Sequence, residues 1–295
     1  MSIAQLVDNL YREQPAGVLY HYTSLGALTG IVDSGCLYAT DIRFFSDAAE
    51  MKHAANILCI YIAQRIEAKS SNSHLFSQLR EWVMERLVDG HMQFVVSFTG
   101  NGNLLSQWRS YCPHGRGVSI GFAPALLTQA ATAQGFRVGK CIYDNRLQKD
   151  LVDSILAEIE NLAEARGENN DSSRRHPSQS FHDVFEEVES DLLRVAALLK
   201  HGKFSEEEEW RAVSPITKNY VHAPIKYREG RTMLIPYVEF SLRGSTPSGL
   251  PLEHVFLGPT PNAGNSMTSL SRFLSKYCAN PRRGVTYCQI PYREH

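Results

Sequence analysis

The sequence predicts an α+β fold in which strands lie toward both ends of the chain and helices occupy the middle. Strand-like segments rich in β-branched and aromatic residues precede residue 145 and follow residue 205, whereas the segment between them has helical apolar spacing. Strands and helices do not alternate as they do in βαβ units, and no internal repeat is present. We therefore expect a single domain over residues 1–295, with a helical insertion at 147–203.

The first half of the chain contains most of the expected strands. Residues 3–13 have helical spacing, the strand VLYHY follows, and Leu25 to Asp33 form one apolar helix face that ends at Gly35. The same criteria assign the other elements of this half. They predict helices at 48–68 and 75–87 and strands at 37–40, 92–99, 118–123 and 136–143.

The second half begins with two helices, at 147–165 and 181–200, separated by a polar segment. This segment, near 166–180, has few apolar residues and is expected to be an exposed loop. It is either a solvated linker or a contact for an acidic partner through Arg174, Arg175 and His176. The remaining elements are strand-like apart from one helix. Strands are predicted at 206–216, 232–242, 254–259 and 286–293, with a helix at 266–277.

Composition restricts the class of function. The formal net charge is -1, so an anionic ligand must be held by a local cluster rather than by the field of the whole protein. The N-terminus lacks a signal-like apolar core, and no run approaches the length of a membrane span. The six cysteines form no CxxC pair, which favours reduced thiols over a zinc site. We therefore expect a cytoplasmic protein that needs neither a membrane nor a metal.

Nucleotide-binding and hydrolase motifs such as GxGxxG, GxxxxGK[ST], HExxH and GxSxG are absent, which leaves three segments that could carry chemistry. The first is His21-Tyr22-Thr23-Ser24, where a strand of apolar residues ends in an imidazole. Either His21 points into a pocket, or it is a hydrogen-bonded core residue and Thr23 or Ser24 caps the next helix.

The second segment is Glu206-Glu207-Glu208-Glu209-Trp210-Arg211. In an extended chain Glu207, Glu209 and Arg211 share one face, an arrangement that can bind a sugar hydroxyl. The alternative is a solvated acidic turn. The four acids run directly into the strand-like WRAV, and an acidic surface turn gives no reason for that continuation.

The third segment is Ser106-Gln107-Trp108-Arg109-Ser110-Tyr111. Arg109 can bind phosphate and Trp108 or Tyr111 can stack on a base, unless the aromatic residues fill the core. Arg116 is a weaker phosphate candidate. A metal-dependent nuclease is the least favoured class, because only Asp41 and Asp47 approach the clustering that it requires.

These segments together resemble a known family. LYHYTSLGALTGIVDSGCLYATD, LLSQWRSYCPHGRGVSIGF, EEEEWR, LIPYVEF, HVFLGP and QIPYR are similar, in order and over nearly the whole chain, to a bacterial domain family of uncharacterised function. The first segment also resembles the ADP-ribosyltransferase superfamily, in its diphtheria-toxin and poly(ADP-ribose) polymerase branch. This resemblance implies split antiparallel β-sheets flanked by helices.

The resemblance also implies roles for individual residues. His21 would bind the ribose hydroxyls, the backbone of Tyr22 would hold the carboxamide, and Phe44 would stack on nicotinamide in place of the usual tyrosine. Glu209 would be the catalytic carboxylate, with Glu207 as the alternative or as the residue that orients the acceptor. The rest of the expected NAD-binding set is Thr23, Ser97, Trp108 and the two pyrophosphate candidates Arg43 and Arg109.

The function implied is consumption of NAD, as a substrate, with transfer of ADP-ribose to a protein or nucleic acid. A toxin or antiviral defence effector of this kind would have a neutralising or regulatory partner protein. Two alternatives remain open at this point. One is NAD hydrolysis, and the other is a non-catalytic nucleotide-binding module, because Phe44 lacks the hydroxyl of the tyrosine that it replaces.

Overall fold

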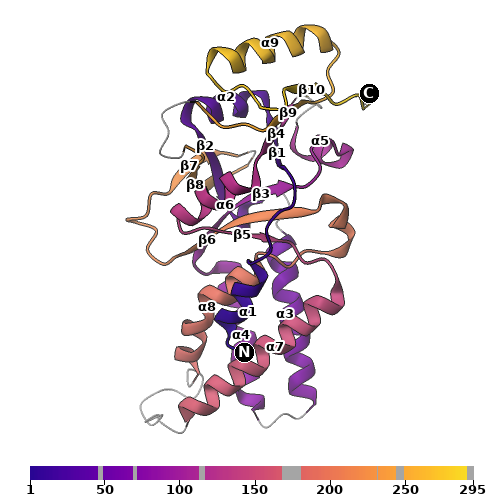
Figure 1. Ribbon diagram of the computed structural model, residues 1–295. Helices are drawn as coiled ribbons and strands as arrows, with labels where there is room; N and C mark the ends of the chain where they lie inside the picture. The colour runs from indigo at the N-terminus through magenta and orange to yellow at the C-terminus, as the bar shows by residue number, and fades with distance from the viewer. Residues whose placement is uncertain are drawn as a thin grey trace.

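The computed structural model describes residues 1–45, 49–68, 72–112, 117–167, 181–230, 232–243 and 249–290. The molecule is elongated, with a layer of helices at one end and a branched sheet with further helices at the other (Figure 1). The helical layer contains α1 (Ile3–Leu10), α3 (Ala49–Glu67), α4 (Ser73–Asp89), α7 (Asn145–Gly167) and α8 (His182–Ala196).

The fold is α+β, as predicted, and the described strands join in one ten-stranded sheet. The strands are β1 (Leu19–Ser24), β2 (Cys36–Asp41), β3 (Met92–Thr99), β4 (Gly117–Phe122), β5 (Arg137–Lys140), β6 (Glu209–Thr217), β7 (Lys226–Glu229), β8 (Leu234–Ser241), β9 (His254–Leu257) and β10 (Val285–Tyr287). The main order is β10-β9-β4-β1-β3-β2-β8-β7, and β6 lies against β3 and β5. Among these pairs only β9–β10 is parallel.

The sheet branches at β3. One edge of β3 pairs with β6 from Met92 to Thr99, and the other edge is shared between two strands. The pair Tyr20–Thr99 joins β1 to one end of β3, and β2 joins the opposite end through Val95 and Phe94. The two neighbours therefore leave β3 in different directions, and a gap opens beside its middle residues. This gap positions the candidate site.

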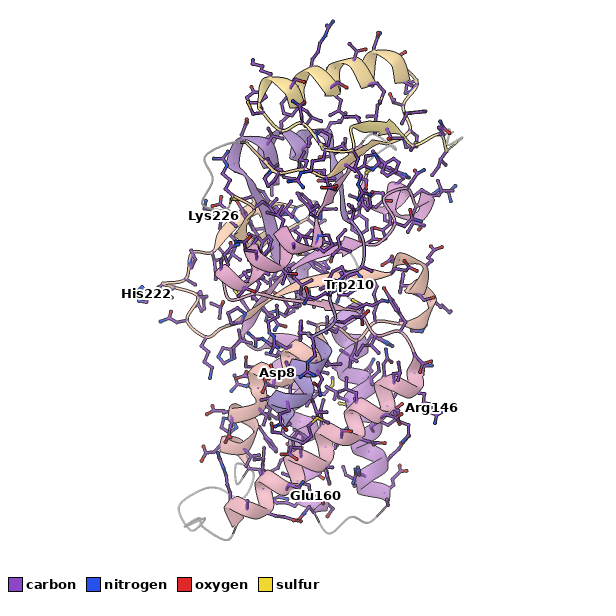
Figure 2. All side chains as sticks on the ribbon, viewed as in Figure 1. Asp8, Arg146, Glu160, Trp210, His222 and Lys226 are labelled. Carbon is purple, nitrogen blue, oxygen red and sulfur yellow. The ribbon has the colours of Figure 1, made fainter. Side chains whose placement is uncertain are left out.

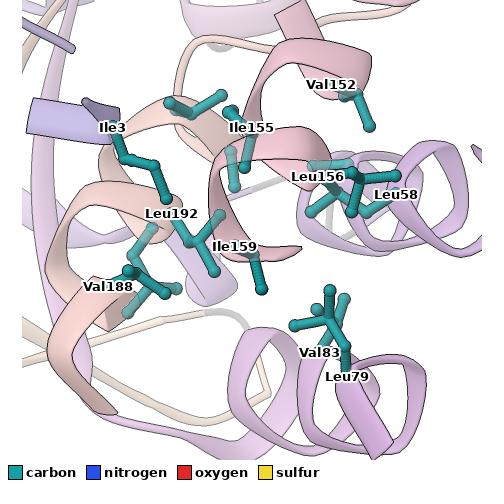
Figure 3. Packing of buried hydrophobic residues seen from close by; sticks show 14 of the residues in the cluster. Ile3, Leu58, Leu79, Val83, Val152, Ile155, Leu156, Ile159, Val188 and Leu192 are labelled. Atoms are coloured by element: carbon teal, nitrogen blue, oxygen red, sulfur yellow. The ribbon is translucent and has the colours of Figure 1, made fainter. Parts of the chain in front are cut away.

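Alternation along β3 gives the sheet two apolar faces. Val95 faces the helical layer and joins the cluster that contains Ile155, Leu156 and Ile159 of α7, which Figure 3 shows from close by. Val96 belongs to the cluster on the opposite face. Over that opposite face lie α2 (Leu25–Ser34), α6 (Pro124–Ala133) and α9 (Ala263–Lys276).

Most predicted elements are present, with differences at particular points. The helix α6 and the exposed strand β7 were not predicted. The strand expected at 206–216 begins at Glu209, because Glu208 adopts a left-handed φ of 43° and Gly202–Glu207 form the 3-10 helix η5. Helices α7 and α8, expected as an insertion, pack into the same core as α1, α3 and α4. Residues 168–180, with Arg174, Arg175 and His176, lie outside the described residues.

No helix of the described residues is long and apolar enough to cross a membrane.

The start of α2 provides a test of the local fold. Ser24 is its N-cap, and the hydroxyl accepts a hydrogen bond from the Ala27 N–H at 3.1 Å. Ser24→Ala should lower the free energy of unfolding by about 1 kcal/mol, because that N–H loses its acceptor. Gly30→Ala in the same helix should raise it by about 0.5–1 kcal/mol, since an added Cβ meets nothing within 4 Å. Chemical denaturation measures the free energy of unfolding of both variants. A Ser24→Ala protein as stable as wild type would contradict the cap assignment.

Candidate functional site

A pocket occupies the gap between β1 and β3. Its empty volume is about 350 Å³, part of which is open to solvent. Residues from both strands, from α5 (Leu105–Tyr111) and from the segment before β6 form its walls. The lining residues are Tyr20, His21, Tyr22, Ser97, Phe98, Thr99, Gln107, Tyr111, Glu207 and Glu209. The structure thus brings together five of the residues singled out from the sequence: His21, Tyr22, Ser97, Glu207 and Glu209.

His21 closes the end of the β1–β3 ladder. Its Nδ1 lies 3.0 Å from the carbonyl oxygen of Ser97, and its ring is edge-on to Phe98. A carbonyl only accepts, so Nδ1 carries the proton and donates it. Burial lowers the pKa of His21 below its ordinary 6.5, although the hydrogen bond to Ser97 acts in the opposite direction. The imidazole is therefore neutral at pH 7, and its Nε2 is a hydrogen-bond acceptor.

The backbone of Tyr22 faces the same gap. The Glu209 carbonyl accepts from the Cys141 N–H, so the backbone of Glu209 faces β5 and its partner Thr99 faces β1. Thr99 pairs with Tyr20, so the backbone groups of Tyr20 face β3. By the alternation of an antiparallel ladder, those of Tyr22 face β3 as well. This orientation leaves the Tyr22 N–H and C=O directed to the side of β1 on which the pocket lies.

Glu209 is held in a buried ionic network at the start of β6. The Nε of Arg211 donates to Oε1 at 2.8 Å, and its Nη2 donates to Oε2 at 3.0 Å. The ammonium of Lys200 donates to Oε2 at 2.5 Å. Arg211 also donates to the Ala197 carbonyl at 2.7 Å, and its guanidinium lies over the ring of Phe45. These contacts fix both oxygens of the Glu209 carboxylate.

Lys200 links the two carboxylates of the pocket. It forms an ion pair with Glu207 as well as with Glu209, although Glu207 belongs to η5 and Glu209 to β6. The side chain of Lys200 is only 3% exposed, that of Glu209 7% and that of Glu207 14%. Gln148 donates to the Lys200 carbonyl at 2.9 Å and so fixes the backbone that carries the lysine.

Two carboxylates and two cations balance in this network. Burial raises the pKa of Glu209, but Arg211 and Lys200 outweigh that effect and lower its pKa to about 2. Glu209 is therefore ionised at neutral pH. A lysine and an arginine that each contact Glu209 are the physical reason that a fully buried carboxylate stays charged.

The short helix α5 forms the third wall and is fixed to β1. The hydroxyl of Tyr22 accepts from the Leu104 N–H at 2.7 Å and donates to the Asn101 carbonyl at 2.8 Å. Trp108 is fully buried, lies edge-on to Tyr22 at 4.7 Å between ring centroids, and donates to Asn103. The Trp108 ring is therefore part of the core, the alternative that the sequence left open for this segment.

Several predicted ligands lie elsewhere. Arg43 forms a bidentate ion pair with Asp41, at 3.0 and 2.6 Å, and donates to the Gly90 carbonyl. Phe44 lies in the 3-10 helix η1 (Ile42–Phe44) and does not line the pocket, nor do Thr23 and the exposed Arg109. The pyrophosphate ligands expected at Arg43 and Arg109 are thus not brought to the pocket. Candidates Arg116 and Asp47 lie outside the described residues.

Sequence reasoning missed two residues of the site, Lys200 and Gln107. Lys200 is the last residue of the helix predicted at 181–200 and shares no motif with the acids that it contacts, so no local signal identifies it. Gln107 and Tyr111 stand four residues apart, a helical spacing within SQWRSY that places both on one face. Tyr111 was a stacking candidate, and the helical spacing from it to Gln107 is the signal that could have identified the glutamine.

Within the described residues, no group of three or more His, Cys, Asp or Glu side chains is placed to hold a metal ion.

Comparison with known proteins gives one match. Residues 107–212 match the model of a family described as "Protein of unknown function (DUF2971)". The matched segment contains α5 from Gln107 onward and the acids Glu207 and Glu209, and it does not reach His21. No curated protein and no solved structure matches the chain.

Proposed function

We propose that this protein cleaves the bond between nicotinamide and ribose in NAD and transfers ADP-ribose to a macromolecular acceptor. One observation carries the proposal: His21 and the acids Glu207 and Glu209, which are far apart in the sequence, line a single pocket. The resemblance to ADP-ribosyltransferases requires this meeting of a strand-end histidine with an acid that opens a later strand.

The chemistry suits these side chains. As the C1′–N bond breaks, its electron pair leaves with nicotinamide and positive charge develops on the ribose ring. Carboxylates fixed beside the sugar stabilise that charge without reorganising. The acceptor then attacks C1′ and loses a proton. Glu207 is better placed than Glu209 to take that proton, because its side chain is the more exposed of the two. The neutral Nε2 of His21 accepts a hydrogen bond from a ribose hydroxyl.

The proposed setting is the bacterial cytoplasm, with the protein acting as a toxin or antiviral effector under the control of a partner protein. This part of the proposal is supported only by the sequence resemblance and by the pattern of scattered cysteines.

Incubation of the protein with NAD labelled on the adenine tests the activity. Nicotinamide should be released, and the label should appear on protein, DNA or RNA added as acceptor. Label found only in free ADP-ribose would show hydrolysis instead of transfer. NAD that binds in calorimetry and is never consumed would identify a binding module and contradict the proposal.

The state of His21 predicts how activity depends on pH. The rate of NAD cleavage at low substrate concentration should fall on the acid side of a midpoint below pH 6.5, because protonated His21 can no longer accept at Nε2. Glu209, with a pKa of about 2, does not titrate in this range. Folding stability should also rise with pH across this window, because the unfolded chain binds the proton more tightly than the folded one.

The control is His21→Asn, which retains a side-chain N–H but has no group that titrates in this range. Its residual activity should be independent of pH between about 5 and 7. If the rate of this variant falls at acid pH as that of wild type does, a group other than His21 is titrating.

A further inference from the structure

Gln107 is buried in the pocket wall without a hydrogen-bond partner. Its side chain is 7% exposed, and it lines the pocket from α5. Of the four glutamines that are buried in the described part of the chain, Gln78, Gln93 and Gln148 each use their side-chain amide in a hydrogen bond. For Gln107 no side-chain hydrogen bond to any described residue is present. The amide atoms of Gln107 stay accessible at the pocket and make no hydrogen bond to the described residues, so a ligand in the pocket can use both the donor and the acceptor of this amide.

The surrounding contacts keep this amide at the pocket. Trp108, the next residue, is locked under Tyr22, and its indole N–H donates to Asn103 at 3.0 Å. The hydroxyl of Tyr22 also accepts from the Leu104 N–H, just before α5 begins. These contacts fix the turn to β1 and so hold the backbone of Gln107 at the pocket wall.

We infer that Gln107 recognises the carboxamide of nicotinamide, donating from its NH₂ to the carboxamide oxygen and accepting from the carboxamide NH₂. This inference rests on the proposed function and deepens it, because it names the residue that selects the leaving group. The amide of Gln107 and the carboxamide each have a donor group and an acceptor oxygen, so they can form two hydrogen bonds to each other. A carboxylate has only acceptor oxygens, so one of them would face the oxygen of Gln107 without a hydrogen bond. Nicotinic acid and its dinucleotide should therefore be rejected.

The neighbouring groups suit a planar amide-bearing ring. Tyr111 lies one helical turn after Gln107 and lines the same pocket, which places a ring beside the amide. The backbone of Tyr22, directed to the β3 side of β1, offers a second donor and acceptor. The acids Glu207 and Glu209 line the same pocket, in the segment before β6 and at the start of β6.

The test compares wild type with Gln107→Leu in two assays. Calorimetry measures binding of free nicotinamide and of nicotinic acid, and a rate assay compares cleavage of NAD with that of its nicotinic acid analogue. Wild type should prefer the amide in both assays. Gln107→Leu should weaken nicotinamide binding by about tenfold or more and should bring the ratio of the two cleavage rates close to one.

Unfolding of the same variants provides a readout that is independent of catalysis. Gln107→Leu should be at least as stable as wild type, because it removes an amide that has no partner. The matched control is Gln148→Leu, which should be less stable, because its amide donates to the carbonyls of Ile142 and Lys200. A loss of stability in Gln107→Leu equal to that in Gln148→Leu would overturn the inference.

The two proposals can fail separately. Binding of nicotinamide that depends on Gln107, without cleavage of NAD, would support the amide site and contradict the transferase. Cleavage of NAD with an unchanged preference in Gln107→Leu would overturn the amide site and support the enzyme. Folded wild type that does not bind nicotinamide at millimolar concentration would also overturn the inference.

Discussion

Replacement of Glu209 by Gln is expected to slow NAD cleavage by about 10²–10³-fold and to lower the free energy of unfolding by about 3 kcal/mol. The catalytic loss follows because the charge that faces the ribose disappears. The loss of stability follows because Arg211 and Lys200, 1% and 3% exposed, remain buried with less negative charge than they require. Single-turnover kinetics and urea denaturation measure the two effects.

The companion variant is Glu207→Gln. Lys200 keeps its bond to Glu209 in this variant, so stability should change by less than about 1 kcal/mol while cleavage still slows. Glu206→Gln, in the exposed part of the same acidic run, should change neither quantity. If Glu209→Gln loses stability but not activity, the role of Glu209 is only to hold Arg211 and Lys200 in place. Glu207 is then the catalytic carboxylate.

Replacement of Lys200 by Met should cost about 3–5 kcal/mol of folding stability at neutral pH, because two carboxylates in a buried site lose the cation that they share. The effect should depend on pH in a defined direction. Glu209 has a pKa of about 2 in the folded protein against an ordinary 4.5, so its stabilisation is present above pH 4.5 and is lost as the pH falls toward 2. The difference between variant and wild type should therefore be largest at neutral pH and should shrink below 4.5.

Lys203→Met provides the control for this prediction, since Lys203 is an exposed lysine in the same segment. Its stability should stay within about 0.5 kcal/mol of wild type at every pH. A Lys200→Met protein with wild-type stability at pH 7 would show that the network contributes no net stability.

Local patterns predicted the elements of this fold well. The β-branched run at 92–99 became β3 with those boundaries, and the Leu25 helix ends at Gly35, whose φ of 70° suits glycine. What could not be predicted is the branching of the sheet, because it depends on which distant strands pair with β3. The short exposed strand β7 has no buried face, so no apolar alternation marked it.

The candidate site was predictable to the extent that it depends on motifs. His21 and Glu209 carried a signal, since an imidazole ending a strand and an acid opening one are unusual in a core. Strand spacing also placed Arg211 on the face of Glu209, but Lys200 carried no signal, because only the tertiary fold brings it to Glu207 and Glu209. Trp210, labelled in Figure 2, alternates with Glu209 along β6 and packs into the apolar cluster on the opposite face of the sheet.

A crystal structure with a non-hydrolysable NAD analogue is the most direct measurement of the central claim. The proposal predicts that the nicotinamide lies beside Gln107 and that its ribose lies between His21 and the acids Glu207 and Glu209. The chain offers a clear alternative location, because a second and wider groove lies between α2 and α9, lined by Leu25, Asn262, Phe273 and their neighbours. An analogue bound in that groove, with the pocket between β1 and β3 empty, would contradict the proposed function.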